Sequence, residues 1–336
     1  MQRCEDAKTQ RKLLVTGGAG FIGSCFIRHI LSKHKDYRVI NLDALTYAGN
    51  IENLDDVKNN PNYTFVHGNI CDKKLVRDLI SQSDWVINFA AESHVDRSIT
   101  GPEIFVETNV QGTLNLLQAC KEIGIEKYLQ VSTDEVYGSL GATGYFYETT
   151  PIQPNSPYSA SKASADLLVR AYYETYKLPV LMTRCSNNYG PYQYPEKLIP
   201  FFISKLLKGE KVPVYGDGLN VRDWLYVYDH CDAIDTVLHK GKIGEVYNIG
   251  GHNEKTNMEI TKLVLSAMGK GESSIQYVED RLGHDKRYAI DNTKIQTELG
   301  WKPSLTFEEG IKITIDWYLQ NQNWMKEIET KKASLV

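Results

Sequence analysis

Short apolar runs alternate with segments of helical periodicity from Lys12 to about Arg184. The runs are rich in Val, Ile and Tyr, which predicts buried strands, and the segments between them repeat apolar residues at helical spacing. Predicted strands cover 12–16, 37–43, 63–68, 85–90, 127–133 and 179–184, and predicted helices cover 26–33, 51–58, 73–81, 104–123 and 159–176. This alternation indicates an α/β fold, in which helices cover both faces of a doubly wound parallel sheet.

Beyond Arg184 the pattern changes to turn-rich segments between shorter elements. Helical periodicity returns at 197–208, 229–240 and 306–320, and no low-complexity linker separates the two parts. We therefore expect a polar tail at 1–10, a first domain at 11–185, and a smaller C-terminal α/β lobe at 186–330 that binds the substrate. The boundary near residue 185 is approximate, and crossing of the chain between the lobes stays open.

Composition and charge exclude several classes of protein. The 336 residues are 42% hydrophobic and 24% charged, which is ordinary for a globular protein, and a net charge of −4 argues against a nucleic-acid partner. No apolar run approaches the roughly 18 residues of a membrane span, and the first residues lack the apolar stretch of a signal peptide. We expect a cytoplasmic protein with no membrane partner. Six scattered cysteines form no cluster at metal-ligand spacing, so we predict neither a disulfide nor a metal.

A glycine-rich turn follows the first predicted strand and opens the first helix. It reads GGAGFIG from Gly17 to Gly23, a spacing variant of the dinucleotide fingerprint. Glycines permit the tight turn and let backbone N–H groups approach a pyrophosphate, which the positive end of the helix dipole attracts. Asp43 ends the second predicted strand, about 20 residues later, where the fingerprint expects an acid for the adenosine ribose. Because this acid would repel a 2′-phosphate, we predict a Rossmann-type domain that binds NAD rather than NADP.

Further polar or small residues follow the next three predicted strands. Asn69-Ile70 follow the third strand, Ala90–Ser93 the fourth, and Thr133–Glu135 the fifth. The carboxyl ends of parallel strands meet at one edge of a sheet, which is where open α/β sheets bind ligands. The sequence therefore predicts one site that contains the glycine-rich turn, Asp43 and all of these residues.

Tyr158 and Lys162 stand four residues apart at the start of a helix that Asn155, Ser156 and Pro157 mark. Their side chains therefore share one face of the helix. A nearby ammonium stabilises a phenolate, so we expect Lys162 to lower the pKa of Tyr158 from about 10 toward neutral pH.

These motifs resemble the extended short-chain dehydrogenase/reductase superfamily, from about Lys12 to about Gln320. More narrowly, they are similar to the dTDP-glucose 4,6-dehydratase family. The segments that carry this likeness are LDALTYAGN, FAAESHVDRSI, STDEVYG, PYSASKA, TRCSNNYGPYQYPEKLIP, VRDWLYVYDH and RLGHDKRYAID. The resemblance implies a hydro-lyase that contains NAD, acts on dTDP-glucose and works in deoxysugar synthesis.

The resemblance also implies a role for each catalytic side chain. Tyr158, supported by Lys162, takes the C4 hydroxyl proton as hydride passes to NAD, and Thr133 bonds the same oxygen. The C4 ketone acidifies C5–H, so that Glu135 removes the C5 proton while Asp134 protonates the departing C6 hydroxyl. NADH then returns hydride to C6. Asp134 needs a raised pKa for this role, which requires burial.

The complete set of expected site residues has three parts. The catalytic residues are Thr133, Asp134, Glu135, Tyr158 and Lys162. The residues expected at the cofactor are Gly17, Gly20, Phe21, Ile22, Gly23, Asp43, Ala44, Leu45, Thr46, Asn69, Ile70, Ala90, Ala91, Glu92, Ser93, Thr108, Tyr158, Lys162 and Asn187. The residues expected at the sugar nucleotide are Ser93, Thr133, Asn187, Lys197, Leu198, Pro213, Tyr215, Arg222, Asn257, Arg281 and His284.

Two alternative functions stay open. A nucleotide-sugar 4-epimerase uses the same cofactor site and Tyr/Lys pair but does not need two acids after Thr133, and a non-catalytic NAD-binding regulator needs no intact catalytic set. The helices at 104–122 and 160–176 resemble the pair that builds a dimer interface in the superfamily, so a homodimer is expected, although their pattern fits packing on the sheet equally well.

Overall fold

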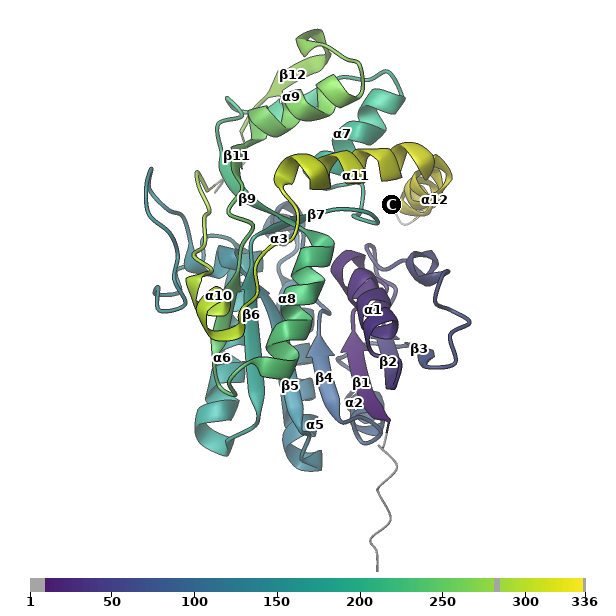
Figure 1. The fold of residues 1–336 in the computed structure, drawn as a ribbon, viewed down its shortest axis with the longest axis vertical. Coiled ribbons are helices and arrows are strands. Elements are labelled where there is room, and N and C mark those ends of the chain that lie inside the picture. Colours follow the sequence, from purple (N-terminus) through teal and green to yellow (C-terminus); the bar gives the residue numbers. More distant parts are fainter. Residues whose placement is uncertain (1–9, 281–284, 335–336) are drawn as a thin grey trace, which may run out of the picture.

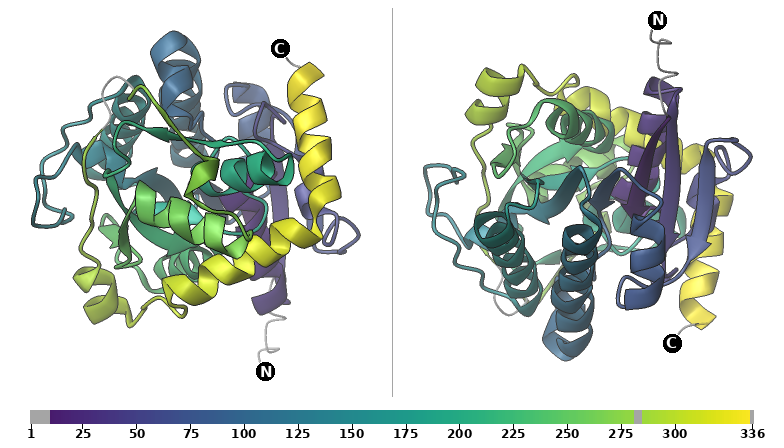
Figure 2. Two further views of the ribbon diagram at one scale, coloured as in Figure 1. Left: turned by 90° about the horizontal axis from the view of Figure 1, so that it is seen from above. Right: turned by 90° about the horizontal axis from the view of Figure 1, so that it is seen from below.

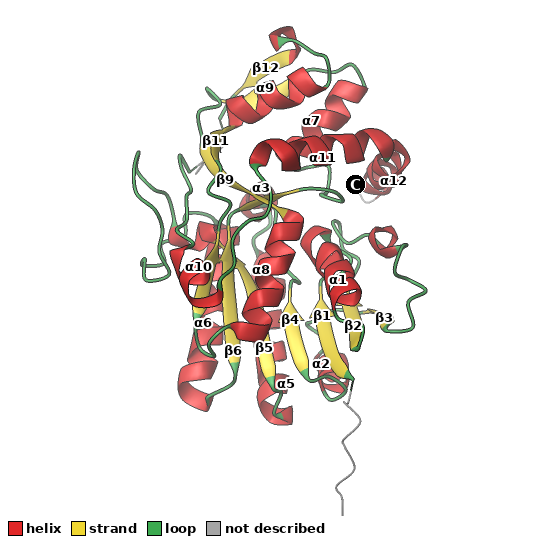
Figure 3. Cartoon of the chain, viewed as in Figure 1, coloured by secondary structure: helices red, strands yellow, loops and turns green. Residues whose placement is uncertain are grey.

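The computed structural model describes residues 10–280 and 285–334, so nearly all of the predicted tail lies outside the described residues. Figure 1 shows a lower lobe built on a sheet and an upper lobe that covers the top of that sheet. Figure 3 shows that most strands belong to the lower lobe, whereas helices dominate the upper one.

Seven parallel strands form the main sheet, in the order β10-β6-β5-β4-β1-β2-β3. The strands are β1 (Arg11–Thr16), β2 (Tyr37–Asp43), β3 (Tyr63–His67), β4 (Trp85–Asn88), β5 (Lys127–Thr133), β6 (Val180–Cys185) and β10 (Val246–Ile249). All six predicted strands are confirmed. The seventh, β10, comes from the second half of the chain and pairs with β6, so the chain returns to the first lobe after it has left it.

Helices cover both faces of this sheet, as predicted, and Figure 2 shows the two layers from either end. Alternate residues of β1 separate two cores: Leu13 and Val15 pack with one set of helices, and Leu14 packs with the other. The first set is α1 (Phe21–Lys33), α8 (Val227–Lys240) and α10 (Thr293–Leu299). The second set is α2 (Lys73–Ile80), α5 (Thr113–Ile123) and α6 (Pro157–Tyr176).

Two predicted helices differ from the structure. The segment 51–58 forms only a 3-10 turn, η1 (Ile51–Leu54), because Asn50 and Asn53 use their side chains to bond each other and Ala19. The segment 104–123 starts with a short helix, α4 (Glu103–Phe105), and continues as a π-helical segment, η2 (Val106–Gly112), before α5 begins. Short π-helical segments occur often at functional sites.

The upper lobe contains two small sheets and four helices. The sheets are β11-β9-β7 and β12-β8. Their strands are β7 (Asn187–Tyr189), β8 (Val212–Tyr215), β9 (Val221–Tyr226), β11 (Glu254–Thr256) and β12 (Ile275–Val278). The helices are α7 (Leu198–Leu207), α9 (Asn257–Ala267), α11 (Phe307–Gln320) and α12 (Gln322–Ser334), and the pattern did not predict α9 or α12. Within the described residues, no helix is both long and apolar enough to cross a membrane.

Candidate active site

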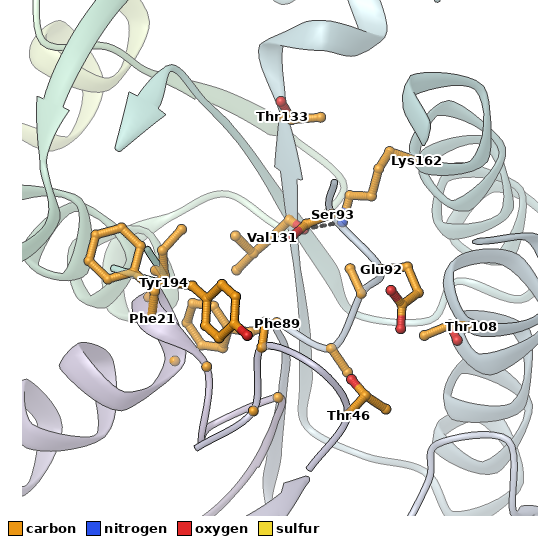
Figure 4. Close-up of a pocket in the computed structure, with 18 of the residues that line it drawn as sticks. Phe21, Thr46, Phe89, Glu92, Ser93, Thr108, Val131, Thr133, Lys162 and Tyr194 are labelled. Atoms are coloured by element: carbon orange, nitrogen blue, oxygen red, sulfur yellow. Dashed lines mark hydrogen bonds between the residues drawn. The ribbon is translucent and has the colours of Figure 1, made fainter. Parts of the chain in front are cut away.

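One cavity lies at the carboxyl edge of the main sheet and extends under the upper lobe (Figure 4). Every residue expected at the cofactor except Leu45 lines it, together with all five expected catalytic residues. In Figure 4, Thr46 and Thr133 lie at opposite ends of the view. The structure therefore brings these residues together around one cavity, and their roles in binding and catalysis stay predictions.

The glycine-rich turn between β1 and α1 fits the close approach of a dinucleotide. Gly17 has a φ of +70°, and a Cβ atom built there would lie 2.6 Å from the backbone nitrogen of Ala90. A Cβ atom at Gly23 would lie 2.3 Å from the carbonyl oxygen of Gly17. No side chain within the described chain caps the start of α1, so the first N–H groups of that helix can bind phosphate.

Asp43 lies at the end of β2, as predicted, and faces the turn. Its carboxylate oxygens accept hydrogen bonds of 2.8 Å from the N–H groups of Ala19 and Leu45. Burial raises the pKa of Asp43, and these two bonds oppose that shift. Each carboxylate oxygen keeps a second lone pair, so the ribose hydroxyls of NAD can still bind here.

Asn109, in the π-helical segment η2, holds the loop that follows β4. Its side-chain oxygen accepts from the N–H of Glu92 at 2.8 Å, and its amide nitrogen donates to the carbonyl of Glu92 and to Oγ of Ser161. Lys197 donates to the carbonyl of Ser93 at 3.1 Å from the other wall of the cavity. These bonds fix the loop between the cofactor turn and helix α6.

Thr133, Asp134 and Glu135 lie at the end of β5 and in the 3-10 turn η3 (Asp134–Tyr137). Oγ1 of Thr133 donates to Oδ1 of Asp134 and accepts from the N–H of Glu135, both at 3.2 Å. Asp134 is only 2% exposed, and its Oδ2 has no hydrogen-bond partner among the described residues. Burial, followed by the charges of Glu135 and Asp223, raises the pKa of Asp134 well above its usual value. The carboxyl group therefore favours its protonated form, as a general acid requires.

Tyr158 and Lys162 lie in the first turns of α6, which begins with a capping box at Ser156. Both side chains are buried. Burial, together with the negative charges of Glu135 and Cys185, raises the pKa of Tyr158 well above its usual value. This direction is opposite to the expected fall of the Tyr158 pKa toward neutral pH, because burial has the largest effect. Burial lowers the pKa of Lys162, and its amine donates to the carbonyl of Val131 at 2.8 Å, as Figure 4 shows.

The residues expected at the sugar nucleotide divide into two groups. Ser93, Thr133, Asn187 and Lys197 line the cavity, whereas Leu198, Pro213, Tyr215, Arg222 and Asn257 lie in the upper lobe and do not line it. Arg222 is 5% exposed, donates to the carbonyls of Val221 and Asp285, and lies 4.4 Å from the ring centre of Tyr288. Its positive charge is nevertheless close enough to lower the pKa of Asp134. Arg281 and His284 lie outside the described residues.

Several lining residues were missed by the sequence analysis. They include Tyr47, Cys185, Gln193, Tyr194 and Glu196. These residues stand inside the segments that carried the family resemblance, but no spacing rule distinguishes them from neighbours that point elsewhere.

A second group of ligand-type side chains lies away from the cavity, between α1 and α8. Nε2 of His34 and Nδ1 of His239 contact Oδ1 of Asp235 at 3.0 and 2.9 Å. The two imidazole rings are stacked at 16° to each other, and the ammonium of Lys33, which lies 2.8 Å from Asp235, already supplies a positive charge at this carboxylate. Burial alone would raise the pKa of Asp235, but hydrogen bonds from His239, His29, Lys33 and His34 hold it well below its usual value. The group is a hydrogen-bonded link between two helices.

The doubly wound sheet, the uncapped glycine-rich turn and the Tyr/Lys helix define an extended short-chain dehydrogenase/reductase. Residues 14–314 match the family described as GDP-mannose 4,6 dehydratase. The dTDP-glucose 4,6-dehydratase of Xanthomonas campestris pv. campestris is 56% identical over 335 residues, which cover 94% of this chain and 95% of that protein. The chain belongs to the dTDP-glucose 4,6-dehydratase family.

Solved structures agree with this assignment. DesIV, a dTDP-glucose 4,6-dehydratase from Streptomyces venezuelae crystallised with NAD and TYD bound, is 51% identical and superposes with a TM-score of 0.92 over 94% of this chain and 99% of that one. The UDP-glucose 4-epimerase of Thermotoga maritima is 32% identical, with a TM-score of 0.86 over 93% of this chain and 99% of that one. The fold is thus shared with epimerases, and the choice of reaction depends on the site.

Proposed function

We propose that this protein is an NAD-dependent hydro-lyase that converts dTDP-glucose to dTDP-4-keto-6-deoxy-glucose. The single observation that carries the proposal is the buried acid pair Asp134 and Glu135, which lies in one cavity with Tyr158 and Lys162. The relatives with this name match nearly the whole chain.

The first task of the site is to make the C5 hydrogen acidic. Bound NAD would supply the hydride acceptor that converts the C4 hydroxyl to a ketone and would return the hydride to C6 at the end, when a proton is delivered to C5. Tyr158 would take the C4 hydroxyl proton at its phenolic oxygen, and Oγ1 of Thr133 would hydrogen-bond the same sugar oxygen. Lys162 donates to the carbonyl of Val131, and in its protonated form it would stabilise the phenolate and so oppose the effect of burial, which raises the pKa of Tyr158.

The second task is to eliminate water across C5 and C6. Glu135 would take the C5 proton at its carboxylate, and Asp134 would give its proton to the C6 hydroxyl, which leaves as water. The buried, protonated state of Asp134 suits this role because hydroxide is a poor leaving group without a proton. The adjacent positions of the two acids allow one to act on C5 while the other acts on C6.

The two alternatives are less well supported. A 4-epimerase transfers hydride at C4 alone, so a buried, protonated acid beside Thr133 has no role in its reaction. A non-catalytic NAD-binding regulator has no need for the complete set of Thr133, Glu135, Tyr158 and Lys162 around one cavity.

The test is incubation of the purified protein with dTDP-glucose and, separately, with UDP-glucose. We expect a product that is one water lighter and contains a ketone, formed faster from dTDP-glucose. A galacto isomer of unchanged mass would instead establish the epimerase, and bound NAD without turnover of either sugar would favour the regulator.

We further propose a homodimer in the cytoplasm. In each subunit, residues 11–185 would form most of the cofactor domain, α8, β10 and α10 would return to that domain, and the rest of 186–330 would form the substrate lobe. Exposed apolar side chains on the two helical segments support the dimer: Ile104, Val106, Leu167 and Tyr176 are 45%, 56%, 55% and 52% exposed. Five described cysteines are free thiols, which is typical of a reducing compartment. The dimer is tested by light scattering of the wild type and of Leu167→Glu, which should be monomeric.

A further inference from the structure

The loop after β2 holds the glycine-rich turn through buried amide side chains. The N–H of Asn50 and the side-chain nitrogen of Asn53 both donate to the carbonyl of Ala19, at 3.0 and 2.9 Å. The N–H of Ala19 is held by Asp43. Asn50 and Asn53 are only 4% and 2% exposed. The position of this loop therefore determines where the backbone of the turn lies.

Helix α12, near the C-terminal end of the chain, lies against this loop. Figure 2 shows this yellow helix beside the purple elements of the N-terminal part of the chain. Nε1 of Trp324 donates to Oδ1 of Asn53 at 3.0 Å. Nζ of Lys331 donates to Oδ1 of Asn50 at 3.1 Å and pairs with Glu52 at 2.8 Å. An indole N–H can only donate, so it requires the oxygen of the Asn53 amide on its own side. The NH₂ group of Asn53 then faces Ala19. Trp324 therefore fixes the orientation of the amide that holds the turn, together with the side-chain nitrogen of Asn50, which donates to the same oxygen at 3.3 Å.

The same helix is anchored in the upper lobe. Glu329 bonds Ser204 and pairs with Lys208 of α7 at 2.7 Å. The indole of Trp324 packs against Trp317 of α11 and against Tyr192, with ring centres 5.2 and 6.0 Å apart. The end of the chain thus joins the lobe that contains the substrate residues to the loop that holds the cofactor turn.

A second contact from α11 reaches the cavity. The hydroxyl of Tyr318, the residue after Trp317, donates to the carbonyl of Gln193 at 2.8 Å, and Gln193 lines the cavity. The guanidinium of Arg28 lies 4.0 Å from the ring centre of Tyr192 and donates to the carbonyl of Asn53. Tyr318 and Arg28 therefore connect α11 and the neighbouring aromatic side chains to one lining residue, Gln193, and to the loop at Asn53.

We propose that α12 is a clasp that retains the dinucleotide, and that Trp324 is the positioning residue through which it acts. The inference rests on the proposed function insofar as it takes NAD as the ligand. The loop at 50–54 acts through the carbonyl of Ala19: if the loop moves away, the turn that would hold the dinucleotide loses its support, and the same movement breaks the bonds to Trp324 and Lys331. A reaction that restores its cofactor in every cycle needs slow release of that cofactor, and the clasp provides it.

The test compares Trp324→Phe with Trp317→Phe. Both changes remove an indole from the same aromatic cluster at a partly buried position, but within the described residues only the first removes a hydrogen bond to the loop. NADH is bound to each protein, and its dissociation is followed by the loss of its fluorescence after addition of excess NAD. Loss of a hydrogen bond to a buried amide should speed release on the order of tenfold in Trp324→Phe, and Trp317→Phe should stay close to the wild type.

Two further readouts separate retention from general damage. With saturating NAD, kcat of Trp324→Phe should equal that of the wild type, whereas its activity after dilution should fall and return when NAD is added. Equal release rates in the two tryptophan variants would overturn the clasp. If Trp324→Phe does not fold, Lys331→Met decides, because it removes only an exposed ammonium and should still speed release; an unchanged rate would overturn the inference.

The result that would contradict the proposed function differs from the result that would contradict the role of α12. Wild-type protein that binds neither NAD nor NADH would contradict the function itself. Tight NADH binding with release rates that are equal in all variants would contradict only the role of α12.

Discussion

Replacing Asp134 by asparagine keeps the shape of the side chain and removes its dissociable proton. The native carboxyl group is buried, and its raised pKa favours the neutral form, so the amide enters a site that already holds an uncharged group. Oδ1 can still accept from Thr133, and the NH₂ group takes the place of the oxygen that has no partner. We therefore expect the variant to fold and to bind NAD and the sugar nucleotide normally.

We expect the substitution to slow the elimination step. General acid catalysis contributes roughly 10²–10⁴-fold, which corresponds to about 3–5 kcal/mol of barrier. In the proposed mechanism, oxidation at C4 uses Tyr158, Thr133 and Lys162, so we expect this step to remain. In a single-turnover experiment, Asp134→Asn should form reduced nicotinamide, seen by its absorbance, and release the dehydrated product more slowly by this factor.

The stability of the variant provides an independent check. The unfolded chain loses the Asp134 proton above about pH 4, while the folded protein keeps it to higher pH, so the wild type loses stability as pH rises from about 4 toward the folded pKa. The melting temperature of Asp134→Asn relative to wild type should therefore rise with pH. Turnover within about a factor of ten of wild type, or failure to form any reduced nicotinamide, would refute the assigned role.

Two other changes test the cofactor turn and the helix link. Gly17→Ala should weaken NAD binding at least about tenfold, because its φ is +70° and its Cβ would lie 2.6 Å from the nitrogen of Ala90. Gly124→Ala is the matched control, with a φ of +81° and open space around it; it should lower the melting temperature and leave NAD titrations unchanged. Asp235→Asn should destabilise the protein to urea at pH 7, and its difference from wild type should shrink as pH falls below about 4, where the depressed pKa of Asp235 stops contributing. A difference that is the same at both pH values would contradict this linkage.

Features that depend on neighbouring residues could be predicted from the sequence. The six strands of the first half, the glycine-rich turn, Asp43 at the end of β2 and the start of α6 all carry local signals, either an apolar run or a capping pattern. Their meeting at one edge also follows, because parallel strands place their carboxyl ends together.

Features that depend on distant contacts could not be predicted. The strand β10 is a run of four residues, VYNI, that becomes the seventh strand only because β6 offers it an edge. Helix α12 has a mostly polar sequence, and its contacts with Asn50 and Asn53 join segments far apart in the chain. The 3-10 turn at 51–54 replaces a predicted helix for the same reason.

The electrostatics of the site also require the three-dimensional structure. The spacing of Tyr158 and Lys162 shows that they share a helix face, but it does not show that both are buried or that the amine of Lys162 binds the carbonyl of Val131. Burial dominates both pKa values and reverses the direction expected for the tyrosine. For Asp134, the proposed role as an acid showed from the sequence that the side chain must be buried, and in the structure it is buried.

The central claim is that one active site oxidises C4 transiently and eliminates water across C5 and C6. The most direct measurement is turnover of dTDP-glucose labelled with tritium at C4, carried out in deuterated water. We expect a product that is one water lighter, with solvent deuterium at C5 and the C4 label moved to C6 of the same molecule. A product that keeps its water and carries the label at C4 would contradict this claim.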